Sequence, residues 1–280
     1  MNKLDNAKRA QIVRCLVEGN SIRATVRLTG CSKNTIAKLL VELGIACLDY
    51  MNKTLVDLPC KLVQVDEIWS FIGCKQKQVT TEKISEGEWV GDVWTWIAID
   101  AETKLIPCFA VGTRDAETAH GFMRDLAGRM ARRIQLTSDG HRTYLNAVDD
   151  AFGGDIDYAM LVKHYGSNDK AGTSDSARRY SPAECTGCEK MPISGRPERK
   201  HISTSYIERQ NLTLRMCNRR FTRLTNAFSK KLENHMASLA IHYMHYNFVR
   251  IHQTLRMTPA MAAGVTAHLW DVEDLVRLLD

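Results

Sequence analysis

The spacing of apolar and polar residues predicts strands and helices through the centre of the chain. Residues 61–70 are apolar almost throughout, which predicts a buried strand, yet two acids, Asp66 and Glu67, lie within this run. The same patterns predict further strands at 93–99, 106–111, 134–136 and 158–162 and helices at 117–130 and 141–152. The predicted fold class is therefore α/β, with a mixed sheet flanked by helices.

The order of these elements indicates which strands lie together. Three successive antiparallel strands, followed by strands joined through helices, is the arrangement of ribonuclease-H-like folds, in which the first and fourth strands are neighbours. Asp66 on the first strand and Asp139 at the end of the fourth would then face each other. Two such carboxylates repel unless a cation neutralises them, and their oxygens suit Mg²⁺. The alternative for Asp139 is a turn aspartate that precedes Gly140.

The two adjacent acids of the first strand cannot share one task. Charged carboxylates are seldom buried unless they are paired or bound to a metal, because desolvation of the ion is costly. Neighbours on a strand point to opposite faces. We therefore expect Asp66 to face a reaction centre and Glu67 to face away from it.

Residues 1–50 predict a separate helical domain, joined by a linker at 51–60. Apolar spacing and capping residues predict three short helices, with Gly30 in the turn before the third. This pattern is typical of a helix-turn-helix domain, whose third helix reads DNA. The outward residues of that helix are Lys33, Asn34, Thr35 and Lys38. A plain three-helix bundle with a solvated polar face is the alternative.

The charge distribution favours a polyanionic partner. The net charge is +6, but residues 1–50 carry eight Lys or Arg against four acids, and residues 196–231 carry ten against two. The rest of the chain is therefore net acidic. This asymmetry favours two nucleic-acid contact surfaces over a general basic coat.

Residues 167–203 are rich in Ser, Gly, Pro and charge and predict an irregular insertion. Cys185 and Cys188 lie within it and would supply half of a tetrahedral zinc site, which His201 and Cys217 could complete only through a fold-back. Two local thiols in a turn is the favoured alternative. The nine scattered cysteines are typical of reduced thiols in a cytoplasmic protein, and neither a signal peptide nor a membrane span is predicted.

A helix that begins near residue 204 carries a third acid, Glu208, among basic residues. A salt-bridge partner and a metal ligand are both open roles for this acid. The arginines that could grip phosphate beside it are Arg209, Arg215, Arg219, Arg220 and Arg223. Residues 232–280 predict a helical extension, in which His242 and His245 are more typical of a packed helix face than of a metal site.

Three short sequences around the acids resemble those of a known family. These are Val-Asp66-Glu-Ile-Trp, Thr-Ser-Asp139-Gly and Ser-Tyr-Ile-Glu208-Arg-Gln-Asn. Together with residues 219–234 and 252–260 they resemble the DDE transposases and retroviral-type integrases, and among these the insertion-sequence-1 family. The resemblance covers roughly residues 60–265 and implies a catalytic domain over residues 61–231. Unlike some members, this chain has no N-terminal zinc finger and presents a single reading frame.

The resemblance implies a DNA transposase that cuts and joins strands with two Mg²⁺ or Mn²⁺ ions held by Asp66, Asp139 and Glu208. Its partners would be double-stranded DNA, as terminal repeats and target, and further copies of the chain in a dimer or larger assembly. The expected location is the cytoplasm, at a bacterial or archaeal nucleoid. The alternatives are a ribonuclease-H-like nuclease and a non-catalytic DNA-binding regulator derived from a transposase.

Overall fold

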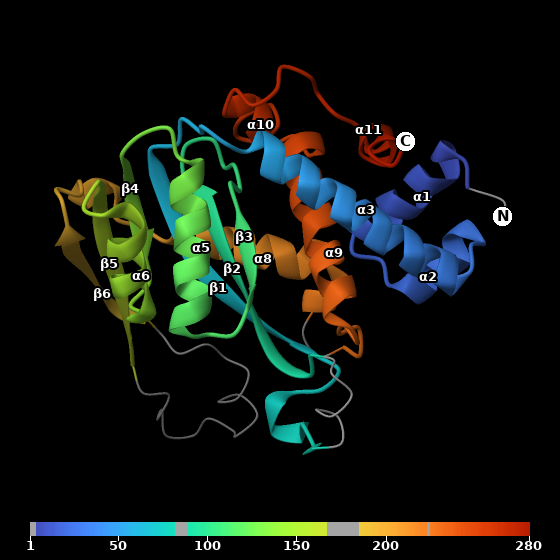
Figure 1. Ribbon diagram of the computed structural model, residues 1–280, viewed down its shortest axis with the longest axis horizontal. Helices are drawn as coiled ribbons and strands as arrows, with labels where there is room; N and C mark the ends of the chain where they lie inside the picture. Colours follow the sequence, from blue (N-terminus) through green and yellow to red (C-terminus); the bar gives the residue numbers. More distant parts are fainter. Residues whose placement is uncertain (1–3, 82–88, 167–184, 223–224) are drawn as a thin grey trace.

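A computed structural model of the chain describes residues 4–81, 89–166, 185–222 and 225–280 (Figure 1). Within these residues, six strands form one mixed sheet in the order β3-β2-β1-β4-β5-β6. The strands are β1 (Leu62–Ile72), β2 (Gly91–Asp100), β3 (Phe109–Gly112), β4 (Ile134–Ser138), β5 (Ile156–Tyr165) and β6 (Cys185–Ser194). Strands β1 to β3 are antiparallel, β4 and β5 run parallel to β1, and β6 is antiparallel to β5. This topology is compatible with a ribonuclease-H-like fold.

Helices cover both faces of the sheet. Figure 1 shows α5 (Ala116–Arg129) and α6 (Thr143–Phe152) together on one face. Trp96 of β2 is fully buried beneath them and contacts Phe122 of α5 and Tyr144 of α6. Helix α8 (Ser205–Cys217) packs against β1 on the opposite face. The short helical turns are η1 (Gln76–Gln78), η2 (Arg199–His201) and η3 (Arg219–Phe221).

Three helices open the chain, and a side chain caps the first turn of each. The helices are α1 (Asn6–Val17), α2 (Ile22–Thr29) and α3 (Lys33–Thr54). Their first turns are capped by the side chains of Asp5, Ser21 and Ser32, each of which accepts a backbone N–H. Gly30 ends α2 in the left-handed conformation, with φ of 71°. A helical N-terminus is therefore present, whereas a helix-turn-helix role stays a prediction.

Helix α3 differs from the expected boundary because it continues to Thr54, inside the segment predicted as a linker. Its second half packs closely along α9 (Leu232–Met244). Gly44 lies so near α9 that a Cβ at this position would come within 2.5 Å of the Ala237 Cα. Beyond position 50 the helix still has a packed face, because Met51 is buried.

The C-terminal helices join the N-terminal ones in a shared core. Helix α9 continues through a π-helical segment, η4 (His245–Val249), and is followed by α10 (Pro259–Ala262) and α11 (Val272–Arg277). Arg14 of α1 pairs with Glu273 of α11, and Asn6 donates to Asp280 at 2.9 Å. Most buried apolar residues form one continuous cluster from α1 through the sheet to α11, and Ala159, Leu161 and Ile202 form a small second one. Among the described helices, none is long and apolar enough to cross a membrane.

Two elements differ from the sequence prediction. The third strand begins at Phe109 instead of residue 106, because the backbone N–H and C=O of Ile106 bond to the Asn247 side chain. The segment predicted as an irregular insertion contains β6, whose side chains are exposed along most of the strand. A strand with no buried face shows no apolar alternation, so its pairing with β5 was not visible in the sequence. Residues 167–184 of that segment lie outside the described residues.

Candidate functional site

The acids of β1 point to opposite faces of the sheet. Asp66 Oδ2 accepts a hydrogen bond from Asn211 Nδ2 on α8 at 2.8 Å. Glu67 faces the other side, where Tyr144 Oη donates to its Oε2 at 2.9 Å and Arg114 Nε donates to its Oε1 at 2.7 Å. The Glu67 side chain is 1% exposed. Glu67 is thus a buried, fully paired carboxylate on the side away from Asp66.

Asp139 follows β4 at the level of Asp66. In the parallel pairing of β1 with β4, Gln64 lies opposite Thr137, and two residues farther along each strand are Asp66 and Asp139. The Asp139 carboxylate accepts the backbone N–H of His141 at 2.9 Å, which fixes the turn after β4. Asp139 therefore stabilises the turn, as the sequence allows, and it also lies at the level of Asp66 on the neighbouring strand.

Gln64 and Thr204 place the start of α8, and with it Glu208. The buried Gln64 side chain points to the same face as Asp66, and its Oε1 accepts the N–H groups of Tyr206 at 2.9 Å and Ile207 at 3.1 Å. These are first-turn donors that have no partner within the helix. The Thr204 hydroxyl donates to Glu208 Oε1 at 2.5 Å. Lys163 of β5 forms an ion pair with the same carboxylate.

The surroundings of Asp66 strongly affect the ionisation of its carboxyl group. The pKa of Asp66 is raised to about 7, mainly by burial and then by the negative charges of Glu67, Asp139 and Glu208. The N–H of Glu67, which donates to Asp66 Oδ1, opposes the shift only in part. A bound cation would reverse the shift, because positive charge favours the ionised carboxylate.

The donor set fits a hard divalent cation, although not as one preformed cage. Asp66, Asp139 and Glu208 offer carboxylate oxygens, and the buried Asn211 Oδ1 beside them has no hydrogen-bond partner in the described part of the chain. Among the described residues, no three His, Cys, Asp or Glu side chains are placed to hold one ion together. Mg²⁺ needs only one or two protein carboxylates alongside water and substrate phosphate. The arrangement therefore suits ions held by pairs of these acids.

Four residues of this site carried no clear signal in the sequence. Gln64, Asn211, Thr204 and Lys163 acquire their roles through contacts between distant segments. Asn211 shows helical spacing with Ile207 and Leu214, which predicts that it lies on the inner face of α8 but not that it meets Asp66.

The predicted DNA-contact residues fall in different environments. Lys33, Asn34 and Lys38 are exposed near the start of α3, whereas Thr35 is half-buried and bonded to Ser32 at its cap. Along α8 and η3, Arg209 is exposed and both Arg215 and Arg219 are half-buried.

Arg220 lies inward instead of on a DNA-facing surface. Its Nη1 donates to Ser229 at 3.0 Å, and burial lowers its pKa to about 10. Arg223 lies outside the described residues.

The fold-back needed for a zinc site with Cys217 is absent from the described residues. Cys185 and Cys188 lie on the exposed edge strand β6, and their Sγ atoms are 3.8 Å apart. Cys217 ends α8 elsewhere and is bonded to Arg250 at 3.4 Å, while His201 lies near Glu198. The thiol pair therefore stands without either of the two residues that the sequence allowed as partners.

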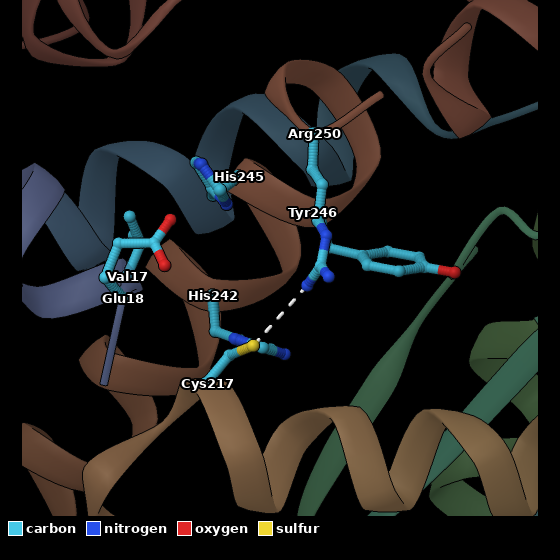
Figure 2. Close-up of a pocket in the computed structure, with 7 residues that line it drawn as sticks. All are labelled: Val17, Glu18, Cys217, His242, His245, Tyr246 and Arg250. Atoms are coloured by element: carbon cyan, nitrogen blue, oxygen red, sulfur yellow. Dashed lines mark hydrogen bonds between the residues drawn. The ribbon is translucent and has the colours of Figure 1, made fainter. Parts of the chain in front are cut away.

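A cavity of about 140 Å³ lies where α1, α8 and α9 meet (Figure 2). Its lining residues are Val17, Glu18, Cys217, His242, His245, Tyr246 and Arg250. The pKa of His242 is lowered to about 3 and that of His245 to about 4, mainly by burial, with the charge of Arg250 contributing to both shifts. Both imidazoles are neutral at pH 7, as packed helix residues would be. None of the three acids lines this cavity.

Comparison with protein-family models and with curated proteins gives no match. Among solved structures, the chain is similar to a piggyBac transposase in a synaptic complex with hairpin DNA. The sequence identity is 10% and the TM-score is 0.40, over 98% of this chain and 69% of the other. At this level the two chains share too little for residue roles to be carried from one to the other.

Proposed function

We propose that this chain is a DNA transposase of the DDE type, which cuts and joins phosphodiester bonds with Asp66, Asp139 and Glu208. The observation that supports this most directly is the register of β1 and β4, which brings Asp66 and Asp139 to the same level of neighbouring strands. Burial first, and then the charges of Glu67, Asp139 and Glu208, raise the pKa of Asp66, in keeping with this placement. The proposal brings together acids from β1, the end of β4 and α8, held in pairs around the ions. Repulsion of this kind is costly to maintain and is typical of functional sites. Within this class, the sequences around the acids resemble the insertion-sequence-1 family.

The three acids would hold two Mg²⁺ or Mn²⁺ ions, which would stabilise the charge on the attacking and departing oxygens of the phosphate. The chain's own residues orient the acids. Asn211 fixes one oxygen of Asp66, and Thr204 fixes one oxygen of Glu208. Lys163 forms an ion pair with Glu208. When a metal ion binds Glu208 and displaces the ammonium group, Lys163 would be free to contact a DNA phosphate. No nucleotide cofactor is required, because phosphodiester energy is exchanged between strands.

Strand transfer from a labelled duplex that carries the ends of the element tests this proposal. With Mg²⁺, the wild-type chain should cut at the 3′ end and join it to target DNA. Asp66→Asn, Asp139→Asn and Glu208→Gln should each lower both steps at least 100-fold while DNA binding survives. Asp150→Asn is the matched control and should keep full activity, because it removes an exposed acid of α6 that pairs with Arg124 of α5.

The outcomes separate the alternatives. Cleavage without joined product would indicate a ribonuclease-H-like nuclease. A specific DNA-binding activity with no cleavage in the wild type, unchanged by Asp66→Asn, would indicate a regulator.

Helices α1 to α3 are proposed to bind the element ends through the exposed start of α3. Loss of two phosphate contacts in the double variant Lys33→Ala, Lys38→Ala should weaken binding and reduce the salt dependence of log K by roughly two. Lys53→Ala removes an exposed lysine from the far end of the same helix and should leave binding unchanged. Equal effects of the two changes would contradict a contact at the start of α3.

A further inference from the structure

Cys185 and Cys188 lie on the same side of β6, which their spacing does not predict. Residues three apart on a regular strand point to opposite faces. Here Cys188 is opposite Lys163 and Cys185 is opposite Tyr165, with a register shift that leaves Thr186 as an extra residue on β6. A bulge of this kind re-aims the side chains that flank it. The two thiols consequently converge, with Sγ atoms 3.8 Å apart.

Both thiols are exposed, and their surroundings are polar. Cys185 Sγ also reaches the carbonyl of Gly187 at 3.4 Å, and Thr186 Oγ1 bonds the His164 carbonyl at 3.2 Å across the strands. The hydrogen bond with Cys185 raises the pKa of Cys188, while the charge of Lys163 opposes this rise. Cys31, Cys47, Cys60 and Cys108 are by contrast buried among apolar residues. Exposure and a resolving partner are what distinguish reactive cysteines from structural ones.

We propose that Cys185 and Cys188 are a reversible dithiol–disulfide couple that reacts with small-molecule disulfides. One thiolate attacks the reagent, for which oxidised glutathione serves as the probe, forming a mixed disulfide and releasing one glutathione thiol. The second cysteine then attacks the protein sulfur of the mixed disulfide and releases the second glutathione thiol. The two protein thiols together lose two protons and two electrons. This chemistry does not depend on phosphoryl transfer.

The couple lies one strand away from the candidate site. Lys163, opposite Cys188, forms the ion pair with Glu208. The same ammonium group favours the Cys188 thiolate and should therefore speed oxidation. Removal of its charge should slow disulfide formation roughly two- to fivefold, which is the range expected of a partly exposed charge contact.

The test exposes the reduced full-length chain to oxidised glutathione, blocks remaining thiols with maleimide and maps the peptides by mass spectrometry. We expect a peptide in which Cys185 and Cys188 are joined and which reduced glutathione restores. Cys188→Ser should instead carry one glutathione on Cys185. Cys74→Ser should leave the joined product unchanged. Lys163→Met should slow its formation, whereas Lys190→Met, on the same strand as the thiols, should not.

Three results would overturn the proposal. The first is full maleimide labelling of both cysteines after exposure to oxidised glutathione. The second is a separate glutathione on each cysteine with no joined product. The third is zinc that purifies with the chain and is lost on Cys185→Ser, which would assign the thiols to a metal site.

Discussion

At the residue scale, two adjacent acids on one strand, Asp66 and Glu67, lie in different electrostatic environments. Glu67 is buried against Arg114 and Tyr144, which satisfy both of its oxygens. Asp66 accepts one amide and one backbone N–H, but its burial, together with three acidic neighbours, raises its pKa to about 7. Because neighbours on a strand point to opposite faces, Glu67 is a paired structural carboxylate, whereas the ionised form of Asp66 is destabilised.

The Asp66 carboxyl should make stability depend on pH. Because its folded pKa lies above the unfolded value, the folded state binds more protons between about pH 4 and 7, and the free energy of unfolding falls as pH rises through this window. Asp66→Asn removes this penalty and should stabilise the metal-free chain at pH 8 by about 2 to 4 kcal/mol, but little at pH 4. Urea unfolding at both pH values measures the difference. An equal effect at the two pH values would refute the assignment.

The Tyr144 hydroxyl should stabilise the fold through Glu67. Tyr144→Phe leaves Glu67 Oε2 without its donor in a buried site, and we expect a loss of about 1 to 3 kcal/mol in the free energy of unfolding. Tyr165→Phe, at a side chain exposed at the end of β5, should change stability by less than about 0.5 kcal/mol. Similar values for the two variants would show that the Glu67 contact contributes little.

At the element scale, the site depends on how α8 is docked on β1. Gln64 accepts two N–H groups of the first turn of α8, and this turn carries Glu208. The contact joins a strand to a helix more than a hundred residues later in the chain. A side chain with no part in chemistry therefore sets the position of the third acid.

Gln64→Leu should damage both stability and activity. It leaves two helix donors unsatisfied, which costs about 1 to 3 kcal/mol, and it frees the start of α8, so strand transfer should fall more than tenfold. Gln135→Leu is the matched control, because Gln135 on β4 accepts the N–H of Glu198 in a similar way, and this contact holds the start of η2 instead of α8. Gln135→Leu should lower the free energy of unfolding by a similar amount and leave the rate of strand transfer unchanged. Equal loss of activity in both variants would contradict a positioning role for Gln64.

At the scale of the whole molecule, the terminal helices belong to the same core as the sheet. Helix α3 packs along α9, and α1 is tied to α11 and to the last residue, Asp280. The sequence predicts a separate module followed by a linker, whereas the structure continues α3 into that linker. DNA held at the start of α3, as proposed, would therefore be connected through packed helices to the sheet that carries Asp66 and Asp139.

The close approach of α3 and α9 predicts an unusual effect of alanine. Gly44→Ala should destabilise the chain by about 1 to 3 kcal/mol, because the new Cβ would overlap Ala237, even though alanine favours a helix. Gly121→Ala, at an exposed position of α5 with open space around it, should instead stabilise by about 0.5 to 1 kcal/mol. Thermal unfolding of both variants measures this. A stabilised Gly44→Ala would mean that α3 and α9 are not in contact.

The sequence by itself determined what depends on neighbours along the chain. Caps at Asp5, Ser21 and Ser32, the buried strand around Asp66 and the opposite directions of Asp66 and Glu67 all follow from local propensity and from the two-residue period of a strand. The prediction that Asp139 lies beside Asp66 required one further assumption, that the first and fourth strands are neighbours.

Only the tertiary structure decided contacts between segments far apart. These include the exposed strand β6 with its paired thiols, the ion pair of Lys163 with Glu208, and the packing of Gly44 on Ala237. Each depends on which surfaces meet after the chain closes on itself. The local pattern of apolar and polar residues does not determine these contacts. The contacting segments are separated by long stretches of chain, which allow many other pairings.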